Sequence, residues 1–85
     1  MIISESGVFG MIDKIQDWFD DRAARLDAMT GFNWYLEFTN DYKMVIEVWI
    51  DDCIIYKRQF TDIKKMMDFV DGELGYALMR EAFGL

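Results

Sequence analysis

The sequence predicts an α+β protein in which a helix, three strands and a second helix follow one another. Three observations predict this order: apolar residues recur at helical spacing over residues 8–29, alternate with polar residues from residue 32 to 60, and return to helical spacing from residue 63. A chain of 85 residues, 53 % of them hydrophobic, has room for one core. We therefore expect residues 1–85 to form a single domain, a three-stranded antiparallel meander with the helices on one face.

The first predicted helix covers residues 8–29. Its apolar residues are three or four positions apart, which places them on one face of a helix. They are Val8, Met11, Ile12, Ile15, Phe19, Ala23 and Leu26. We expect Ser4 or Ser6 to cap the first turn by accepting a backbone N–H, and Gly31 to end the helix in a left-handed conformation.

Two strands are predicted between residues 32 and 50, because apolar and polar side chains alternate on both sides of a short polar turn. The apolar faces of the two strands coincide only if Phe38 lies opposite Met44 and Leu36 lies opposite Ile46. This register predicts a connecting loop of about three or five residues, since a two-residue turn would bring the wrong faces together.

The third strand follows a second short turn and ends at residue 60, and its register is open. A two-residue turn pairs Ile50 with Cys53, whereas a three-residue loop pairs Ile50 with Ile54. We favour the three-residue loop because it also sets Glu47 across from Lys57 as a cross-strand ion pair. It places three residues on the core side, namely Ile54, Tyr56 and Phe60.

The second helix is predicted from residue 63 nearly to the C-terminus, with Thr61 or Asp62 as its cap. Its apolar stripe consists of Ile63, Met66, Met67, Val70, Leu74, Ala77 and Leu78. Gly72 and Gly75 interrupt the stripe, and each glycine inside a helix costs about 1 kcal/mol relative to alanine. We therefore expect the helix to kink or to break into two short helices near these residues.

The charge and the missing residue types exclude several classes of function. There are 9 Lys and Arg against 16 Asp and Glu, a net charge of −7. Direct binding to nucleic acid or to an anionic membrane is not expected, because both need clustered basic residues. The chain has no histidine and a single cysteine, Cys53, so it lacks the commonest general base and a multi-cysteine metal site. We expect a non-enzymatic protein without metal or cofactor.

The location of the protein is indicated by what its sequence lacks. No apolar run approaches the roughly 18 residues of a membrane span. The N-terminal residues lack the basic segment that opens a signal peptide. Together with the single cysteine, these features predict a soluble protein in the reducing cytoplasm.

Several carboxylates fall on the polar side of the first helix. At about 100° per residue, Asp13, Asp17, Asp20 and Asp27 form one stripe opposite the apolar face. Successive members rise by about 4.5 to 6 Å where they are three or four residues apart, comparable to the roughly 7 Å between backbone phosphates of DNA. Further candidate acids are Asp21, Asp41, Asp51 and Asp52. Such a surface could compete for a basic groove of a protein, or could simply be a solvated helix face.

Aromatic and apolar residues form a second candidate surface. With helices on one side of the sheet, its other face carries Tyr35, Val45, Trp49 and Ile55 among charged residues, and Trp18 flanks the first helix. Exposed aromatic patches rimmed by charge are typical of protein interfaces. The alternative function is therefore a protein–protein adaptor or a homo-oligomer, with a homodimer as one form; these residues could also pack beneath loops.

The element order, the 85-residue length and the acidic charge resemble those of small phage-encoded anti-CRISPR proteins, which inhibit type II Cas nucleases by mimicking DNA. The resemblance covers the whole chain in topology and charge and includes no sequence motif. It implies an inhibitor in the host cytoplasm whose partner is a Cas nuclease–guide complex. In that complex, the inhibitor would occupy the basic site that reads protospacer-adjacent DNA. The residues that match by chemistry are Asp13, Asp17, Asp20, Asp27, Asp41, Asp51 and Asp52. The chain is more aromatic and less acidic than extreme DNA mimics, which favours a mixed hydrophobic and acidic interface.

Overall fold

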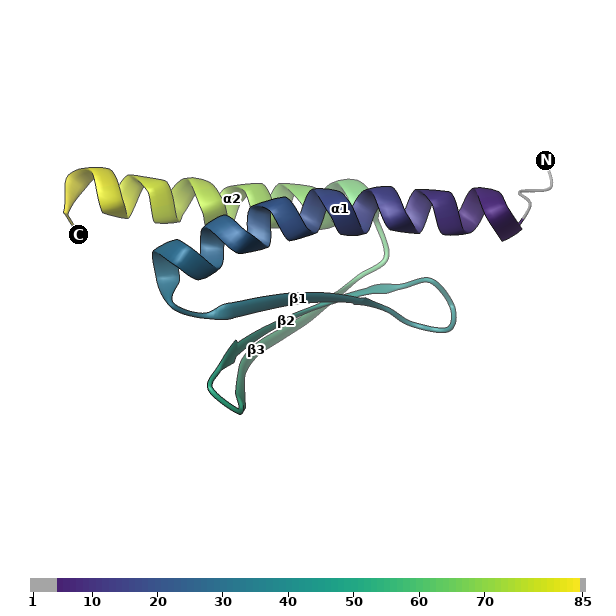
Figure 1. Cartoon of the computed structure of the whole chain (residues 1–85), viewed down its shortest axis with the longest axis horizontal. Helices are drawn as coiled ribbons and strands as arrows, with labels where there is room; N and C mark the ends of the chain where they lie inside the picture. Colours follow the sequence, from purple (N-terminus) through teal and green to yellow (C-terminus); the bar gives the residue numbers. More distant parts are fainter. Residues whose placement is uncertain (1–4, 85) are drawn as a thin grey trace.

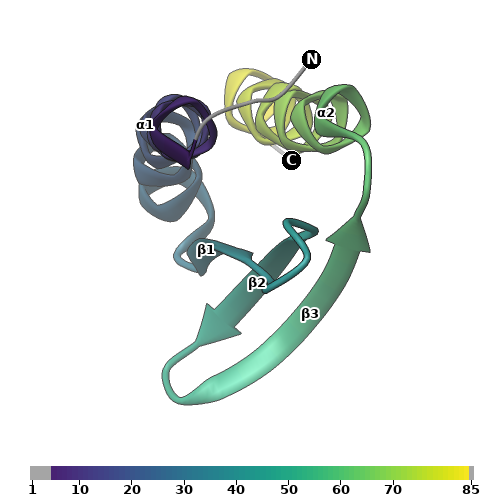
Figure 2. The ribbon, with the colours of Figure 1, turned by 90° about the vertical axis from the view of Figure 1, so that its right-hand side faces the viewer.

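The computed structural model describes residues 5–84, with side chains described from residue 10 onward. The elements are α1 (Glu5–Thr30), β1 (Asn33–Phe38), β2 (Met44–Ile50), β3 (Cys53–Phe60) and α2 (Ile63–Phe83). The strands form one antiparallel sheet in the order β1-β2-β3, and the two helices run parallel to each other over one face of it (Figure 1, Figure 2). The predicted α-β-β-β-α order and the antiparallel meander are confirmed.

The end of α1 lies where the sequence predicts it. Gly31 has a left-handed φ of 76°, and its N–H donates to the Asp27 carbonyl at 2.9 Å. At the other end, Ser6 lies inside the helix, which begins at Glu5, so Ser6 is not its cap. The other predicted cap, Ser4, lies outside the described residues.

The first hairpin has the predicted register. Phe38 pairs with Met44 and Leu36 pairs with Ile46. The strands are joined by residues 39–43, a loop of the longer predicted length. This loop places the apolar sides of β1 and β2 on the same face of the sheet, toward the helices.

The second hairpin combines the two registers that the sequence left open. Ile50 pairs with Cys53 across a two-residue turn, which is the option that we did not favour. Further along the strands, Glu47 nevertheless pairs with Lys57, because the register shifts beside Val48. One extra residue of β3 at this shift forms a β-bulge. The charged groups of Glu47 and Lys57 are not among the ion pairs of the described residues, so the predicted cross-strand ion pair is not observed.

The bulge exchanges the faces of two isoleucines. Ile54 pairs with Trp49 on the face away from the helices, so the prediction that Ile54 faces the core is wrong. Ile55, which we expected on the outer face, instead lines a hollow on the helix side together with Trp34 and Phe69. The extra residue interrupts the strict alternation of side chains, which is why alternation alone assigns both residues to the wrong face.

The second helix is continuous, contrary to the expectation of a kink or a break. Asp62 caps it as predicted, accepting the N–H groups of Lys64 at 2.8 Å and Lys65 at 3.2 Å. Gly72 and Gly75 are exposed, and no atom outside their own turns lies within 4 Å of where a Cβ would stand. The buried side of α2 is packed along this whole stretch, and that packing offsets the low helix propensity of the two glycines.

Gly75→Ala is therefore expected to raise the free energy of unfolding by about 0.5–1 kcal/mol, because the helical backbone accepts alanine there without a clash. Gly31→Ala is the matched control. It should lower stability by about 1–2 kcal/mol, since the φ of 76° is unfavourable for a residue with a Cβ. Urea denaturation followed by circular dichroism measures both changes, and a loss of stability in Gly75→Ala would contradict this account of α2.

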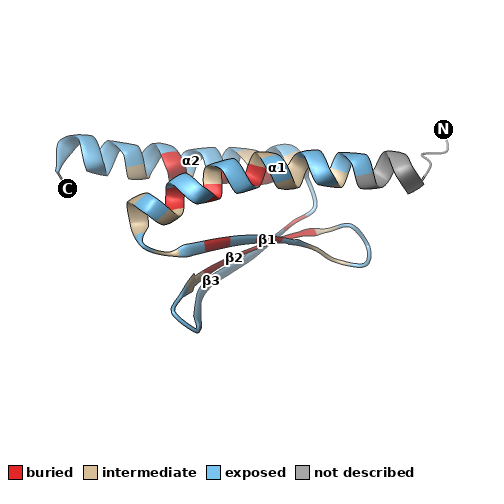
Figure 3. Ribbon diagram, in the orientation of Figure 1, coloured by how far each residue is buried: buried red, intermediate tan, exposed pale blue. Residues whose placement is uncertain are grey.

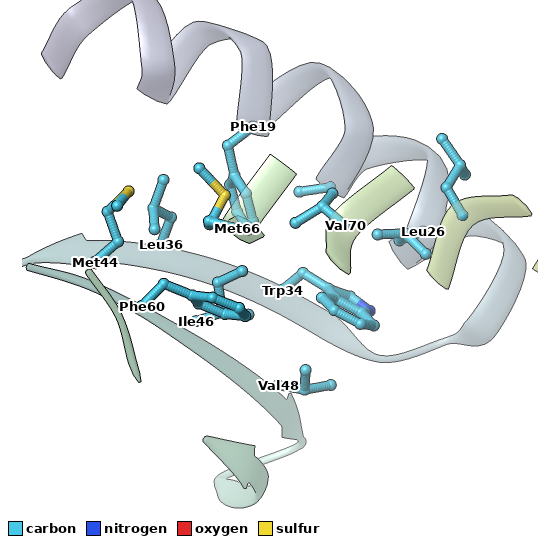
Figure 4. Packing of buried hydrophobic residues seen from close by; sticks show 12 residues of the cluster. Phe19, Leu26, Trp34, Leu36, Met44, Ile46, Val48, Phe60, Met66 and Val70 are labelled. Carbon is cyan, nitrogen blue, oxygen red and sulfur yellow. The ribbon is translucent and has the colours of Figure 1, made fainter. Parts of the chain in front are cut away.

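The core lies between the helices and the inner face of β1 and β2 (Figure 4). Its largest fully buried side chains are Phe19, Leu26, Met44, Ile46, Met66 and Val70. In contrast, β3 is exposed along its length except at Phe60, because it curves away from both helices (Figure 2, Figure 3). Two helices and two strands thus supply most of the core.

The helices are offset along their shared direction, so each projects beyond the sheet at an opposite end (Figure 1). The offset helps to make the molecule elongated, with extents of 50 × 26 × 17 Å. Met11 and Leu78 were expected in the buried stripes but are 45 % and 49 % exposed. Met11 lies at the rim of the core, where it lines an open hollow with Phe38, Tyr42 and Met44.

Candidate functional site

The outward side of α1 presents three carboxylates in a row. Asp13, Asp17 and Asp20 are exposed, and helical geometry places them on the side opposite the buried Phe19 and Leu26. None of the three forms an ion pair with any residue that the structure describes. At about 1.5 Å per residue, they span about 10 Å of a single helix, which holds their relative positions fixed. These three residues are the acidic face of α1.

Asp21 lies beside this face but is paired with basic residues. Its carboxylate is 3.6 Å from a guanidinium nitrogen of Arg22 and 3.6 Å from one of Arg25. Arg22 also donates from Nε to Asp71 of α2 at 3.0 Å and lies over the ring of Trp18 at 4.2 Å. Trp18 is half-buried and packed against the core cluster, so it belongs to the edge of the core rather than to a free surface.

Asp27 was expected in the acidic stripe but is partly buried and has a structural partner. Its carboxylate accepts the backbone N–H of Trp34 at 3.0 Å, which connects the end of α1 to the start of β1. Burial raises the pKa of this carboxyl above its ordinary value of 3.8, and the hydrogen bond from Trp34 opposes that rise. Asp27 therefore holds the fold together at this junction.

The acids of the two turns lie far from one another. Asp41 is in the β1–β2 loop, where it accepts from Thr39 and pairs with Lys43 at 3.2 Å. The hydrogen bond from Thr39, followed by that from Lys43, lowers the pKa of Asp41 below 3.8. Asp51 and Asp52 form the β2–β3 turn at the opposite end of the sheet (Figure 1). The eight candidate acids thus do not form one site.

The apolar residues predicted for the outer face of the sheet are less exposed than the sequence suggests. Tyr35 is 51 % exposed, but Trp49 is half-buried and Val45 is buried. These two residues lie on the central strand, where side chains of β1 and β3 flank them on either side. Ile55 lies on the helix side of the sheet. On the outer face, Ile54 is therefore the residue of β3 that lies beside Trp49.

The most exposed apolar surface lies on the C-terminal part of α2 and is not among the surfaces predicted from the sequence. Tyr76, Met79 and Phe83 are 61 %, 54 % and 73 % exposed. Their spacing of three and four residues was a readable signal, because it places them on one side of a helix. It was missed because the buried stripe of the same helix already accounted for one apolar face.

An open cleft of about 770 Å³ lies between the end of α1 and the C-terminal part of α2. Its lining combines apolar residues with the charges of Arg25, Arg80 and Glu81. Within residues 5–84, no group of three or more Asp, Glu or Cys side chains is placed to hold a metal ion. Neither helix has, in its described residues, an apolar stretch that could cross a membrane.

These features define a small α+β protein with an acidic helix face at one side and an apolar helix end projecting from the sheet. Comparisons with protein-family models, with curated proteins and with solved structures found no match to this chain.

Proposed function

We propose that this protein is a non-enzymatic inhibitor that inserts the acidic face of α1 into the basic DNA-binding groove of another protein. The observation that carries the proposal is the row of three exposed carboxylates, Asp13, Asp17 and Asp20, without ion-pair partners among the described residues. Carboxylates held at fixed spacing can replace DNA phosphates beside lysines and arginines, and the exchange requires no reaction chemistry.

The distribution of charge supports the choice of α1. Four of the nine basic residues lie on β3, which is the edge strand on the other side of β2 from β1, and on the first turn of α2. They are Lys57, Arg58, Lys64 and Lys65. Residues 13–27 of α1 also hold three basic residues against five aspartates, a net charge of 3 − 5 = −2. Two of these basic residues, Arg22 and Arg25, pair with Asp21 and leave the acidic face of α1 unpaired. A basic groove is therefore attracted more strongly to the acidic face of α1 than to the basic residues near β3, which orients the protein as it approaches.

The resemblance to anti-CRISPR proteins narrows the proposed partner to a Cas nuclease loaded with its guide RNA. The acidic face of α1 makes the contact with this partner, because Asp41, Asp51 and Asp52 lie in turns at separate places on the sheet. Inhibition then arises by exclusion of target DNA from the groove that the acidic face fills.

The test is binding of the purified protein to a panel of guide-loaded type II Cas nucleases, measured with and without target duplex and at two salt concentrations. The variant combines Asp13→Lys, Asp17→Lys and Asp20→Lys, and the matched control makes the same charge change elsewhere with Asp52→Lys, Asp68→Lys and Glu81→Lys. We expect the first to weaken binding by roughly tenfold to a hundredfold and the control to retain most of it, because close charge pairs dominate such interfaces.

Three outcomes would overturn the proposal. One is that no complex in the panel binds the protein, and another is that bound protein is insensitive to DNA and salt. The third is that the α1 variant binds as well as the control. If Tyr35→Ala and Trp49→Ala abolish binding while the α1 variant retains it, the outer sheet face is the interface and the protein acts as an adaptor.

A further inference from the structure

The projecting part of α2 has a second apolar stripe, separate from the one that faces the core. Gly72, Tyr76, Met79 and Phe83 follow one another at steps of four, three and four residues. This is the spacing of the contact positions of a coiled coil. The three large side chains are 54–73 % exposed, and helical geometry turns them away from the buried Val70 and Leu74. Nothing in the described part of the chain covers this stripe (Figure 3).

We propose that two copies of the chain associate through this stripe as an antiparallel helix pair, with a two-fold axis between Tyr76 and Met79. In this register, Tyr76 of each copy lies opposite Met79 of the other, and Phe83 lies opposite Gly72. No atom outside its own turn lies within 4 Å of the Cβ position of Gly72, so this position has space for the ring of Phe83. The pairing is isologous and therefore closes as a dimer.

The charges beside the stripe select the second copy as its partner. Glu73 and Arg80 each follow a stripe residue directly, so they lie on the same flank of it, seven residues apart. In the antiparallel pair, Glu73 of each copy faces Arg80 of the other, which forms two ion pairs. Neither residue has an ion-pair partner within the described chain. A parallel pair would instead bring Glu73 beside Asp68 of the second copy, where two like charges repel.

The area of the stripe fits a reversible dimer. A buried aromatic side chain contributes about 150–250 Å². At 61 % and 73 % exposure, Tyr76 and Phe83 have most of that area still to bury. With Met79 and the flanking residues, the total over both copies is on the order of 1,000 Å², which is the lower end for specific interfaces.

The mass of the free protein in solution tests the proposal. It is measured by light scattering over a range of concentrations, with reductant present because Cys53 is exposed and could form a disulfide between copies. We expect about twice the chain mass of 10.1 kDa at high concentration. Met79→Lys should give a monomer, whereas Met11→Lys, the same change at an exposed methionine of α1, should leave the dimer intact.

A charge exchange tests the antiparallel register. Glu73→Arg and Arg80→Glu should each weaken the dimer by about tenfold or more. In each variant, both ion pairs across the interface are replaced by pairs of like charges. The double variant should recover the affinity, and circular dichroism establishes that each variant is folded. A monomer at several hundred micromolar, an unchanged dimer in Met79→Lys, or a failure of the double variant to recover would each overturn the proposal. The measurement needs no other partner, so its outcome is independent of the proposed inhibition.

Discussion

Phe19→Ala is expected to lower the free energy of unfolding by about 3–5 kcal/mol, the largest effect of any substitution proposed for this protein. Phe19 is only 1 % exposed and points from α1 into the space between Met66 of α2 and the sheet (Figure 4). Its removal leaves a cavity shared by both helices. Small domains are stable by about 5–15 kcal/mol in total, so this single substitution should remove a large fraction of the stability of the fold.

Urea denaturation followed by circular dichroism measures this loss. Tyr35→Ala is the control, because Tyr35 is an aromatic residue that is half exposed on the outer face of the sheet. Tyr35→Ala should lower the free energy of unfolding by well under half as much as Phe19→Ala. Substitutions on the surface, away from caps, turns and buried polar groups, usually change stability by no more than about 0.5 kcal/mol. Equal losses in the two variants would show that the core is not centred where the helices meet the sheet.

Asp27→Ala is expected to lower the free energy of unfolding by about 1–3 kcal/mol, because it leaves the Trp34 N–H without its acceptor at the junction of α1 and β1. Asp27→Asn keeps an acceptor oxygen at the same position. It should therefore retain or exceed the stability of the original chain at neutral pH, since it avoids the partial burial of a charge.

The pH dependence of these stabilities follows from the raised pKa of Asp27. Burial favours the protonated carboxyl in the folded state, so the folded chain binds more protons than the unfolded chain just above pH 3.8. The contribution of Asp27 is therefore greatest below pH 3.8 and falls as the pH rises through the raised pKa. Relative to Asp27→Asn, the original chain should lose stability as the pH rises from 3.8 through the raised pKa of Asp27. A relative gain of stability as the pH rises above 3.8 would contradict this direction.

Asp27 also shows why a candidate site is harder to predict than a helix. Its position on the helix surface groups it with Asp13, Asp17 and Asp20, and only the path of the chain after Gly31 brings the Trp34 N–H to its carboxylate. In the same way, Asp21 becomes neutralised by arginines of its own helix, one of which reaches Asp71 of α2. The spacing of residues in the sequence predicts which side of a helix each side chain lies on. It does not predict the hydrogen-bond and ion-pair partners that other elements of the fold supply.

The sequence by itself determined the order of the elements, the end of α1 at Gly31 and the register of the first hairpin, and it narrowed the cap of α2 to Thr61 or Asp62. All of these depend on local periods and local backbone preferences. The tertiary structure decided the β-bulge, the continuity of α2 and the offset between the helices. These features depend on contacts between elements that are distant in the sequence. Such contacts favour the extra residue in β3, and they favour the continued packing of α2 past its glycines.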